Sequence, residues 1–330
     1  MQVLAGDAGG TKTILAVVES ARGSFHILAE ERFASRQHSG LAPIITTFLT
    51  RAGLKVDVAC IGVPGAITAG VCRTPNLPWV LTEPDLAAQT GIRQIELVND
   101  FVAAAAGVQM LGSDAIATLQ DGNPQPTGTR AVIGAGTGLG QAVLVWNGTS
   151  FLVNPTEAGH ADLAPRGELQ RELAAYLESR HEHVSVERAV SGPGLVSIYK
   201  FLVERGVSSW PEIAESFLTE DPGEVIARHA QSHRDLACEQ ALDLFVEMYG
   251  AEAGNLALRA LPHGGLYVAG GIAPKILRVL RQGSFMRAFL DKGRLRDTLL
   301  TIPVYVVLDS KLGLYGAAVN AFSRHPEMNR

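Results

Sequence analysis

The chain has 330 residues, of which 47% are hydrophobic and 18% charged, which is enough apolar material for a core in each of two domains. Its formal net charge is −5, with no long basic run, so nucleic acid and acidic membrane surfaces are poor candidate partners. It has no apolar run of about 18 residues, and the sequence after Met1 has no signal-peptide pattern, so we expect neither a transmembrane helix nor a signal peptide.

The first 110 residues alternate between strand-like and helix-like segments. A strand at 3–5, a turn with the sequence Gly6-Asp7-Ala8-Gly9-Gly10-Thr11 and a strand at 13–18 form a first glycine hairpin with an acid in its turn. Periodicity and turn residues predict further strands at 26–33, 56–63 and 95–98, and helices at 41–52, from Thr82 to Gly91 and at 101–111.

A second glycine hairpin lies in the middle of the chain. Apolar runs at 131–133 and 142–146 flank four alternating glycines, Gly134, Gly136, Gly138 and Gly140. Backbone N–H groups of such a loop can approach a phosphate closely. A dinucleotide-binding loop would lead into a helix and a P-loop would end in Gly-Lys-Ser or Gly-Lys-Thr, so neither fits. A glycine hairpin without a ligand stays an alternative, because glycine spacing alone is a weak signal.

The rest of the chain continues the alternation. The patterns predict strands at 266–269 and 304–308, and helices at 168–177, 195–203, from Asp221-Pro222, 235–261, from Pro274 and 312–322. Strands that alternate with helices imply α/β layers. Cys60, Cys72 and Cys238 have no metal-ligand spacing, so we expect reduced thiols in a cytoplasmic protein.

Two residues mark the carboxyl end of a predicted strand. Asn99 and Asp100 lie between the strand at 95–98 and the helix at 101–111. Asn and Asp are favoured helix caps, and α/β folds also place ligands at the carboxyl ends of strands. The two roles are compatible, and both stay open at this point.

Further polar residues follow the second hairpin. Glu157 and His160 come after Asn154-Pro155, so we expect an irregular loop that is either solvated or the wall of a polar pocket. Glu187 is either a surface glutamate or part of the same pocket. Gly270-Gly271 follows a strand and forms either a plain turn or a flat backbone surface for a purine ring. Two glycine hairpins, a strand-end Asp and this polar set together suggest phosphoryl transfer to a polyol, which needs a base, backbone donors and Mg²⁺.

In segments 6–11, 97–101, 134–140, 157–160, 187–195 and 269–272 the chain resembles the bacterial glucokinase family, within the sugar kinase, actin and heat-shock ATPase fold group. The segments appear in the family's order and span nearly the whole chain. Lys12 and Ala158 depart from the family pattern, which has Asn and Gly there in many members. The related repressor and kinase family is disfavoured because its cysteine-rich zinc motif is missing.

The resemblance implies a two-domain actin-like ATPase (ribonuclease H-like) α/β fold, each domain a mixed five-stranded sheet with flanking helices and the ligand cleft between them. The small domain would comprise residues 1–110 and 312–330, and the large domain residues 111–311. The resemblance also implies a homodimer that uses ATP and Mg²⁺.

The resemblance assigns roles to individual residues. Asp100 would be the general base for the 6-hydroxyl of glucose, and Asp7 would position Mg²⁺ through water. The implied glucose ligands are Asn99, Asp100, Glu157, His160 and Glu187. The implied ATP-binding residues are Gly6, Asp7, Ala8, Gly9, Gly10, Thr11, Gly136, Thr137, Gly138, Gly270 and Gly271.

Two alternatives to an ATP-dependent glucokinase remain open. One is a kinase for another hexose or with another phosphoryl donor, because epimers differ in only one hydroxyl. The other is a non-catalytic sugar-sensing protein on the same fold, which predicts loss of the base or of the phosphate loop, and both are present.

Overall fold

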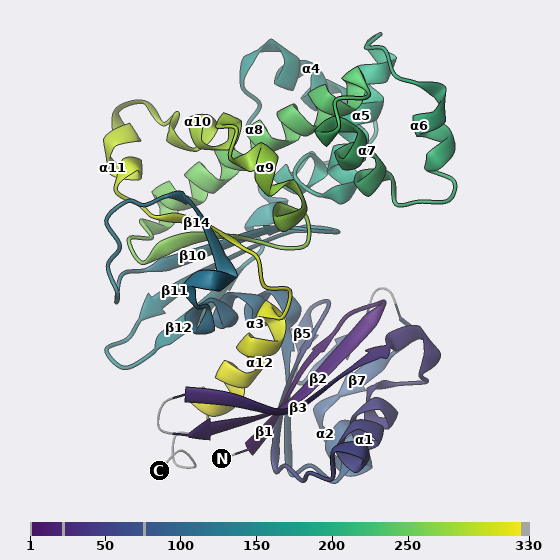
Figure 1. Cartoon of the computed structure of the whole chain (residues 1–330), viewed down its shortest axis with the longest axis vertical. Helices are drawn as coiled ribbons and strands as arrows, with labels where there is room; N and C mark the ends of the chain where they lie inside the picture. Colours follow the sequence, from purple (N-terminus) through teal and green to yellow (C-terminus); the bar gives the residue numbers. More distant parts are fainter. Residues whose placement is uncertain (1, 22–23, 75–76, 325–330) are drawn as a thin grey trace. The chain divides into compact units, whose positions relative to one another are not determined.

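The computed structural model describes residues 2–21, 24–74 and 77–324 and shows an α/β fold with mixed sheets (Figure 1). The chain divides into two compact units. The first comprises Met1–Gly112, Asn147–Asn154 and Asp309–Arg330, and the second Ser113–Trp146 and Pro155–Leu308. Of the predicted small-domain segments, residues 1, 22–23, 75–76 and 325–330 lie outside the described residues.

The first unit contains a five-stranded mixed sheet in the order β3-β2-β1-β4-β8. Its strands are β1 (Gln2–Ala8), β2 (Lys12–Ala21), β3 (Ser24–Ala34), β4 (Val58–Val63) and β8 (Gln94–Asn99). β1, β2 and β3 are antiparallel, whereas β4 is parallel to β1 and β8 is parallel to β4. A second sheet joins β5 (Ile67–Thr68), β6 (Val71–Arg73) and β7 (Val80–Thr82).

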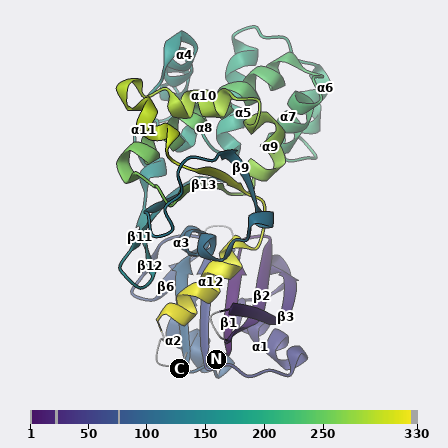
Figure 2. The same cartoon turned by 60° about the vertical axis from the view of Figure 1, so that its left-hand side comes forward.

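Alternating apolar residues in β1 point to two helical layers. Leu4 belongs to a core with α1 (Leu41–Ala52) and α2 (Glu83–Thr90). Val3 and Ala5 belong to a core with α3 (Asp100–Gly107) and α12 (Leu312–Ser323) on the other face (Figure 2). The short 3₁₀ helices of this unit are η1 (Ser35–Gln37) and η2 (Val108–Met110).

The helices α3 and α12 pack at very close range. A Cβ atom on Gly316 would lie 1.5 Å from the Ala103 carbonyl oxygen, and one on Gly107 would lie 2.1 Å from that of Leu312. Only glycine fits at these two positions, which explains the small residues along one side of the last helix.

The strands of the second unit belong to a six-stranded sheet in the order β12-β11-β10-β13-β14-β9, of which residues 151–154 in β12 are grouped with the first unit. The strands of this sheet are β9 (Ile116–Gln120), β10 (Arg130–Ala135), β11 (Leu139–Trp146), β12 (Phe151–Thr156), β13 (Gly265–Ala269) and β14 (Val304–Val307). The expectation of one five-stranded sheet per domain is wrong here, because β9 pairs antiparallel with β14 as an extra strand. Gln120 holds it there, since its Nε2 donates to the carbonyls of Leu299 and Ile302.

Helices of the second unit gather on one side of its sheet in Figure 1, around the longest helix, α8. They are α4 (Gly167–Glu178), α5 (Gly192–Glu204), α6 (Pro211–Ser216), α7 (Pro222–Gln231), α8 (Leu236–Ala260), α9 (Leu277–Leu280), α10 (Ser284–Leu290) and α11 (Arg296–Leu300). The 3₁₀ turns are η3 (Ser113–Ala115), η4 (Ala158–His160), η5 (Val186–Arg188), η6 (Ala273–Ile276) and η7 (Gly293–Leu295). None of the described helices is long and apolar enough to cross a membrane.

Most predicted boundaries hold within two or three residues, because local capping chemistry defines them. The helix predicted at 41–52 ends at Gly53, which has a φ of 66°, and Ser191 caps α5 by accepting from Gly194 N–H. The helix predicted at 101–111 ends earlier: α3 stops at Gly107 and η2 follows.

Candidate active site

The first glycine hairpin has a shorter turn than expected. Gly6, Asp7 and Ala8 are strand residues that pair with β2, so the turn consists of Gly9, Gly10 and Thr11. Ser35 holds this turn in place. Its N–H donates to Thr11 O at 3.0 Å, and its buried hydroxyl donates to Gly9 O at 2.7 Å.

Asp7 lies at the end of β1, where its side chain meets the start of α12. A Cβ atom on Gly313 would lie 3.2 Å from Asp7 Oδ2, so any larger residue at position 313 would press against this carboxylate. Burial raises the pKa of the Asp7 carboxyl above its usual range, and the nearby Lys12 lowers it by a smaller amount. Lys12, which departs from the family pattern, therefore acts on Asp7 electrostatically.

The helix cap between β8 and α3 is Asn99 alone. Asn99 Oδ1 accepts from the N–H groups of Phe101 and Val102 at 3.0 and 3.2 Å, and its Nδ2 donates to Gly65 O at 3.2 Å. Asp100 is the first residue of α3, and its Oδ1 accepts from the N–H of Phe101 at 2.8 Å. The sequence did not decide whether Asn99 or Asp100 caps the helix. In the structure Asn99 is the cap, so Asp100 is not needed for that role.

The carboxyl of Asp100 has an unusual affinity for protons. Surrounding protein atoms reduce its hydration and, together with the negative charge of Asp7, raise its pKa to about 6, although the hydrogen bond from Phe101 N–H opposes the shift. The residue is nevertheless exposed to solvent, so a proton can reach the carboxylate. A carboxylate with such a pKa is a stronger base than an ordinary Asp and is still ionised at neutral pH.

This pKa predicts the pH dependence of turnover. If Asp100 must be ionised to accept a proton, kcat/KM for the sugar falls about tenfold per pH unit below pH 6 and is level above it. Initial rates at saturating ATP and low glucose between about pH 5 and pH 8 would measure this profile. A midpoint near 4, typical of an unperturbed Asp, would contradict the assignment.

The second glycine hairpin is also tighter than predicted. Gly134 and Gly140 face each other in the ladder of β10 and β11, so only Gly136, Thr137 and Gly138 form the turn. Gly136 N–H donates to Gly138 O at 2.8 Å. A Cβ atom on Gly136 would meet nothing within 4 Å, so its backbone faces open space that a phosphate could enter.

Glu187 connects this turn with the predicted sugar residues. Its Oε2 accepts from Leu139 N–H at 2.8 Å, and a Cβ atom on Gly138 would lie 2.5 Å from the same oxygen. Its Oε1 lies 4.0 Å from Nδ1 of His160. Glu187 thus touches both the glycine turn and the neighbourhood of His160.

The loop that carries Glu157 and His160 is ordered rather than irregular, which corrects the expectation. Residues 158–160 form η4, with Glu157 just before it. Gly159 is required because a Cβ atom there would lie 2.0 Å from Leu139 O, whereas Ala158 needs no glycine geometry. Backbone bonds from Val186 N–H to Ala161 O and from Leu163 N–H to Val184 O join this loop to the segment before Glu187.

A cavity of about 630 Å³ in the second unit opens beside the glycine turn. Gly136, Thr137, Pro193, Gly271 and Ile272 line it, and all of them lie in segments that the sequence singled out. Further lining residues of α5, α7 and η6 were not predicted for the site: Val196, Lys200, Pro222, Ala227 and Lys275. Gly270 has a φ of +83°, and a Cβ atom there would lie 2.4 Å from Ala135 O, so both conformation and space demand glycine. The size and largely apolar lining suit a nucleoside.

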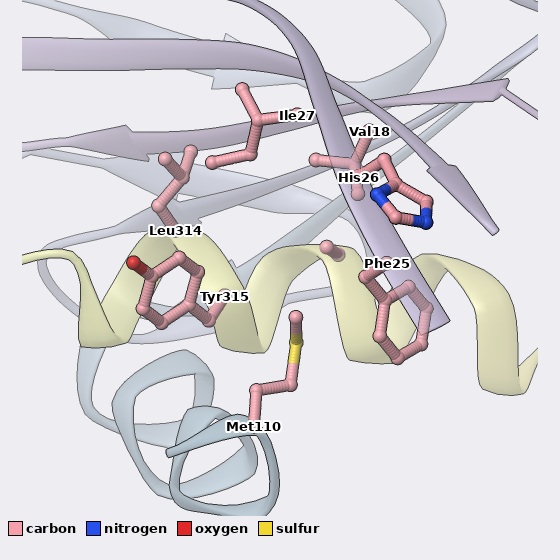
Figure 3. Close-up of a pocket in the computed structure, with 8 residues that line it drawn as sticks. Val18, Phe25, His26, Ile27, Met110, Leu314 and Tyr315 are labelled. Carbon is pink, nitrogen blue, oxygen red and sulfur yellow. The ribbon is translucent and has the colours of Figure 1, made fainter. Parts of the chain in front are cut away.

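A second cavity, of about 390 Å³, lies in the first unit between α12 and the β2–β3 hairpin (Figure 3). Its lining is mostly apolar and contains none of the predicted site residues: Val18, Phe25, His26, Ile27, Met110, Leu314, Tyr315 and Ala318.

The structure therefore places the predicted residues in defined groups. In the first unit, Asp7 and Asp100 interact electrostatically, and Asn99 adjoins them. In the second unit, Glu187 lies near His160 and binds the backbone next to the glycine turn, and Gly271 lines the cavity. Ser35 and the cavity-lining residues Val196, Lys200 and Ala227 were missed, because single buried hydroxyls and helix faces carry no local signal.

Comparison with known proteins gives the class and then the family. A glucokinase from Nostoc sp. is 44% identical over 336 residues, covering 97% of this chain and 98% of the relative. A glucokinase from Synechocystis sp. is 41% identical over 344 residues, covering 96% and 97%. A crystal structure of glucokinase from an Antarctic psychrotroph matches with a TM-score of 0.86 at 30% identity, covering 98% and 99%. The fold is thus that of the sugar kinases. The family model described as Glucokinase matches residues 4–324, and the chain belongs to the glucokinase family.

Proposed function

We propose that this chain is a glucokinase that transfers the γ-phosphoryl group of ATP to the 6-hydroxyl of D-glucose, giving glucose 6-phosphate and ADP. The observation that carries this proposal is that Asn99 and Asp100 have different roles. Asn99 caps the helix, which leaves the Asp100 carboxylate available as a base with a pKa of about 6.

In the proposed reaction, the 6-oxygen of glucose forms a bond to the γ-phosphorus while the bond from that phosphorus to the β,γ-bridging oxygen breaks. The proton of the 6-hydroxyl passes to the carboxylate of Asp100. ADP leaves with the electron pair of the broken bond. Proton acceptance by a positioned carboxylate contributes about 10²- to 10⁴-fold to such a rate.

The two glycine turns would hold the phosphates through backbone N–H groups, and the cavity beside Gly136 and Gly271 would hold the adenosine. Mg²⁺ in kinases is held by one or two carboxylates together with phosphates and water, and it neutralises charge that develops on the phosphates. Asp7 fits this role. Its carboxylate lies beside Gly313 and carries charge close enough to Asp100 to raise that residue's pKa.

Glucose recognition would use Asn99, Glu157, His160 and Glu187. Asn99 Oδ1 accepts from two N–H groups of the helix, and its Nδ2 donates one hydrogen to Gly65 O. One N–H of the amide therefore remains for the sugar. Glu157, His160 and Glu187 offer carboxylate and imidazole groups, which can pair with several hydroxyls. Glu187 also binds the N–H of Leu139, so we expect its orientation to be set before the sugar arrives.

We propose that the two compact units are the two domains of an actin-like ATPase (ribonuclease H-like) fold. We also propose a homodimer in the cytoplasm, where buried thiols such as Cys60, Cys72 and Cys238 stay reduced.

A panel of hexoses with ATP, ADP and polyphosphate as donors would test the proposed function. A wrong epimer leaves a polar group of the site unpaired, which costs about 1–3 kcal/mol, or roughly 5- to 150-fold in kcat/KM. We expect ATP as the donor and glucose to exceed galactose by at least that factor. Equal turnover of the two sugars would favour a general hexose kinase, and sugar binding without turnover would favour a sensing protein.

A further inference from the structure

Tyr249 is a fully buried residue in the middle of α8. Its ring packs against Phe245 and Phe285, with centroid distances of 5.8 and 5.6 Å and interplanar angles of 60° and 86°. Gly250 and Gly254 in the same helix let α10 approach, since a Cβ atom on Gly250 would lie 2.1 Å from Phe285 O. The ring is therefore held on several sides, and its hydroxyl has little freedom to move.

The hydroxyl of Tyr249 binds backbone groups of two neighbouring parallel strands. It accepts from Ala135 N–H at 3.1 Å, and it lies 3.3 Å from Ile133 O and 3.4 Å from Ala269 O, to which it can donate its single proton. Ala135 is the last residue of β10, and Ala269 is the last residue of β13. The turn at 136–138 follows β10 directly, and Gly270-Gly271 follows β13 directly.

Ala135 lies at the point where the regular sheet ends. The register between β10 and β13 stops at the pair Gly134 and Ala269, so Ala135 N–H has no partner in β13 and binds the hydroxyl instead. The carbonyl of Ala135 accepts from Ile272 N–H at 3.4 Å, and Gly270 packs against the same residue. Ala135 therefore adjoins both the turn at 136–138 and Gly270-Gly271, and the side chain of Tyr249 binds Ala135.

We propose that Tyr249 is a positioning residue for the nucleotide, whose hydroxyl sets the spacing between the phosphate-binding turn at 136–138 and the adenosine-side Gly270-Gly271. The inference rests on the proposed function, because that function assigns the two turns to one nucleotide. Without the hydroxyl, Ala135 N–H would be buried without an acceptor, and the end of β10 would shift to relieve it. Displacements of about 1 Å at such a site can cost roughly 100-fold in function.

The test compares Tyr249→Phe with Tyr199→Phe by calorimetric titration with a non-hydrolysable ATP analogue and, separately, with glucose. Tyr199 is a matched control, because it is buried in the same core and its hydroxyl binds Ser209 Oγ at 2.7 Å, away from both turns. We expect Tyr249→Phe to raise the Kd for the analogue about 10- to 100-fold. The Kd for glucose should change less than about threefold, and Tyr199→Phe should leave both constants unchanged.

The outcomes separate this inference from the proposed function. A parent protein that does not bind the analogue would sink the proposed function itself. A folded Tyr249→Phe that binds the analogue as the parent does would overturn only the positioning role. If Tyr249→Phe does not fold, hydrogen exchange in the parent decides: we expect the analogue, and not glucose, to slow exchange of the Ala135 amide, and an unchanged rate would overturn the proposal.

Discussion

Asp100→Asn is expected to lower kcat by about 10²- to 10⁴-fold, the range typical of removing a general base. The substitution keeps the size of the side chain and removes its negative charge and its ability to take up a proton. Folding should survive, because the cap of α3 is Asn99, and an amide oxygen at position 100 can still accept from Phe101 N–H. The measurement is kcat of the purified variant at saturating glucose and ATP, with glucose binding checked by calorimetry.

The stability of this variant has a predictable sign. The pKa of Asp100 is raised in the folded protein, so its ionisation opposes folding, and stability is lost as the pH rises through about 6. At pH 8 we therefore expect Asp100→Asn to melt no lower than the parent, with a small effect because the residue is exposed.

Asp85→Asn serves as the matched control, since Asp85 is exposed in the first turn of α2. It makes the same change of charge at a helix start outside the predicted site. A kcat for Asp100→Asn within about threefold of the parent, far inside the range for losing a base, would return Asp100 to a structural role.

Gly138→Val is expected to lower kcat/KM for both substrates by about 100-fold, a loss typical of misplaced site residues. The new Cβ atom would lie 2.5 Å from Glu187 Oε2, so the carboxylate must move and give up its bond from Leu139 N–H. That movement disturbs a predicted glucose ligand and the phosphate turn at the same time. Substitution of Gly138 is therefore expected to affect the binding of both substrates and not of ATP alone.

Gly136→Val separates the two substrates. A Cβ atom on Gly136 meets nothing within 4 Å and points into the open space where the phosphate would lie. We expect this variant to raise KM for ATP and to leave the Kd for glucose as in the parent. If Gly138→Val also spares glucose binding, Glu187 does not contact the sugar as assigned.

Local sequence was sufficient for most elements of the fold. The helix at 41–52 could be predicted because its apolar spacing and Gly53 lie next to each other in the chain. Both glycine hairpins could be predicted for the same reason, although each turn has only three residues and is shorter than predicted. The extra strand β9 could not, because a five-residue segment of moderate polarity becomes a strand only when β14 lies beside it.

The candidate site divides in the same way. The sequence by itself determined which groups are available: a strand-end Asn and Asp, two glycine turns, an acid at position 7, and the polar residues Glu157, His160 and Glu187. Only the tertiary structure decided which neighbours these groups contact. It made Asn99 the cap, brought Glu187 to Leu139, and set the Tyr249 hydroxyl against Ala135 across 114 positions of chain. Hydrogen bonds and burial act between atoms that folding brings together, so pKa shifts and positioning contacts have no signature in neighbouring residues of the sequence.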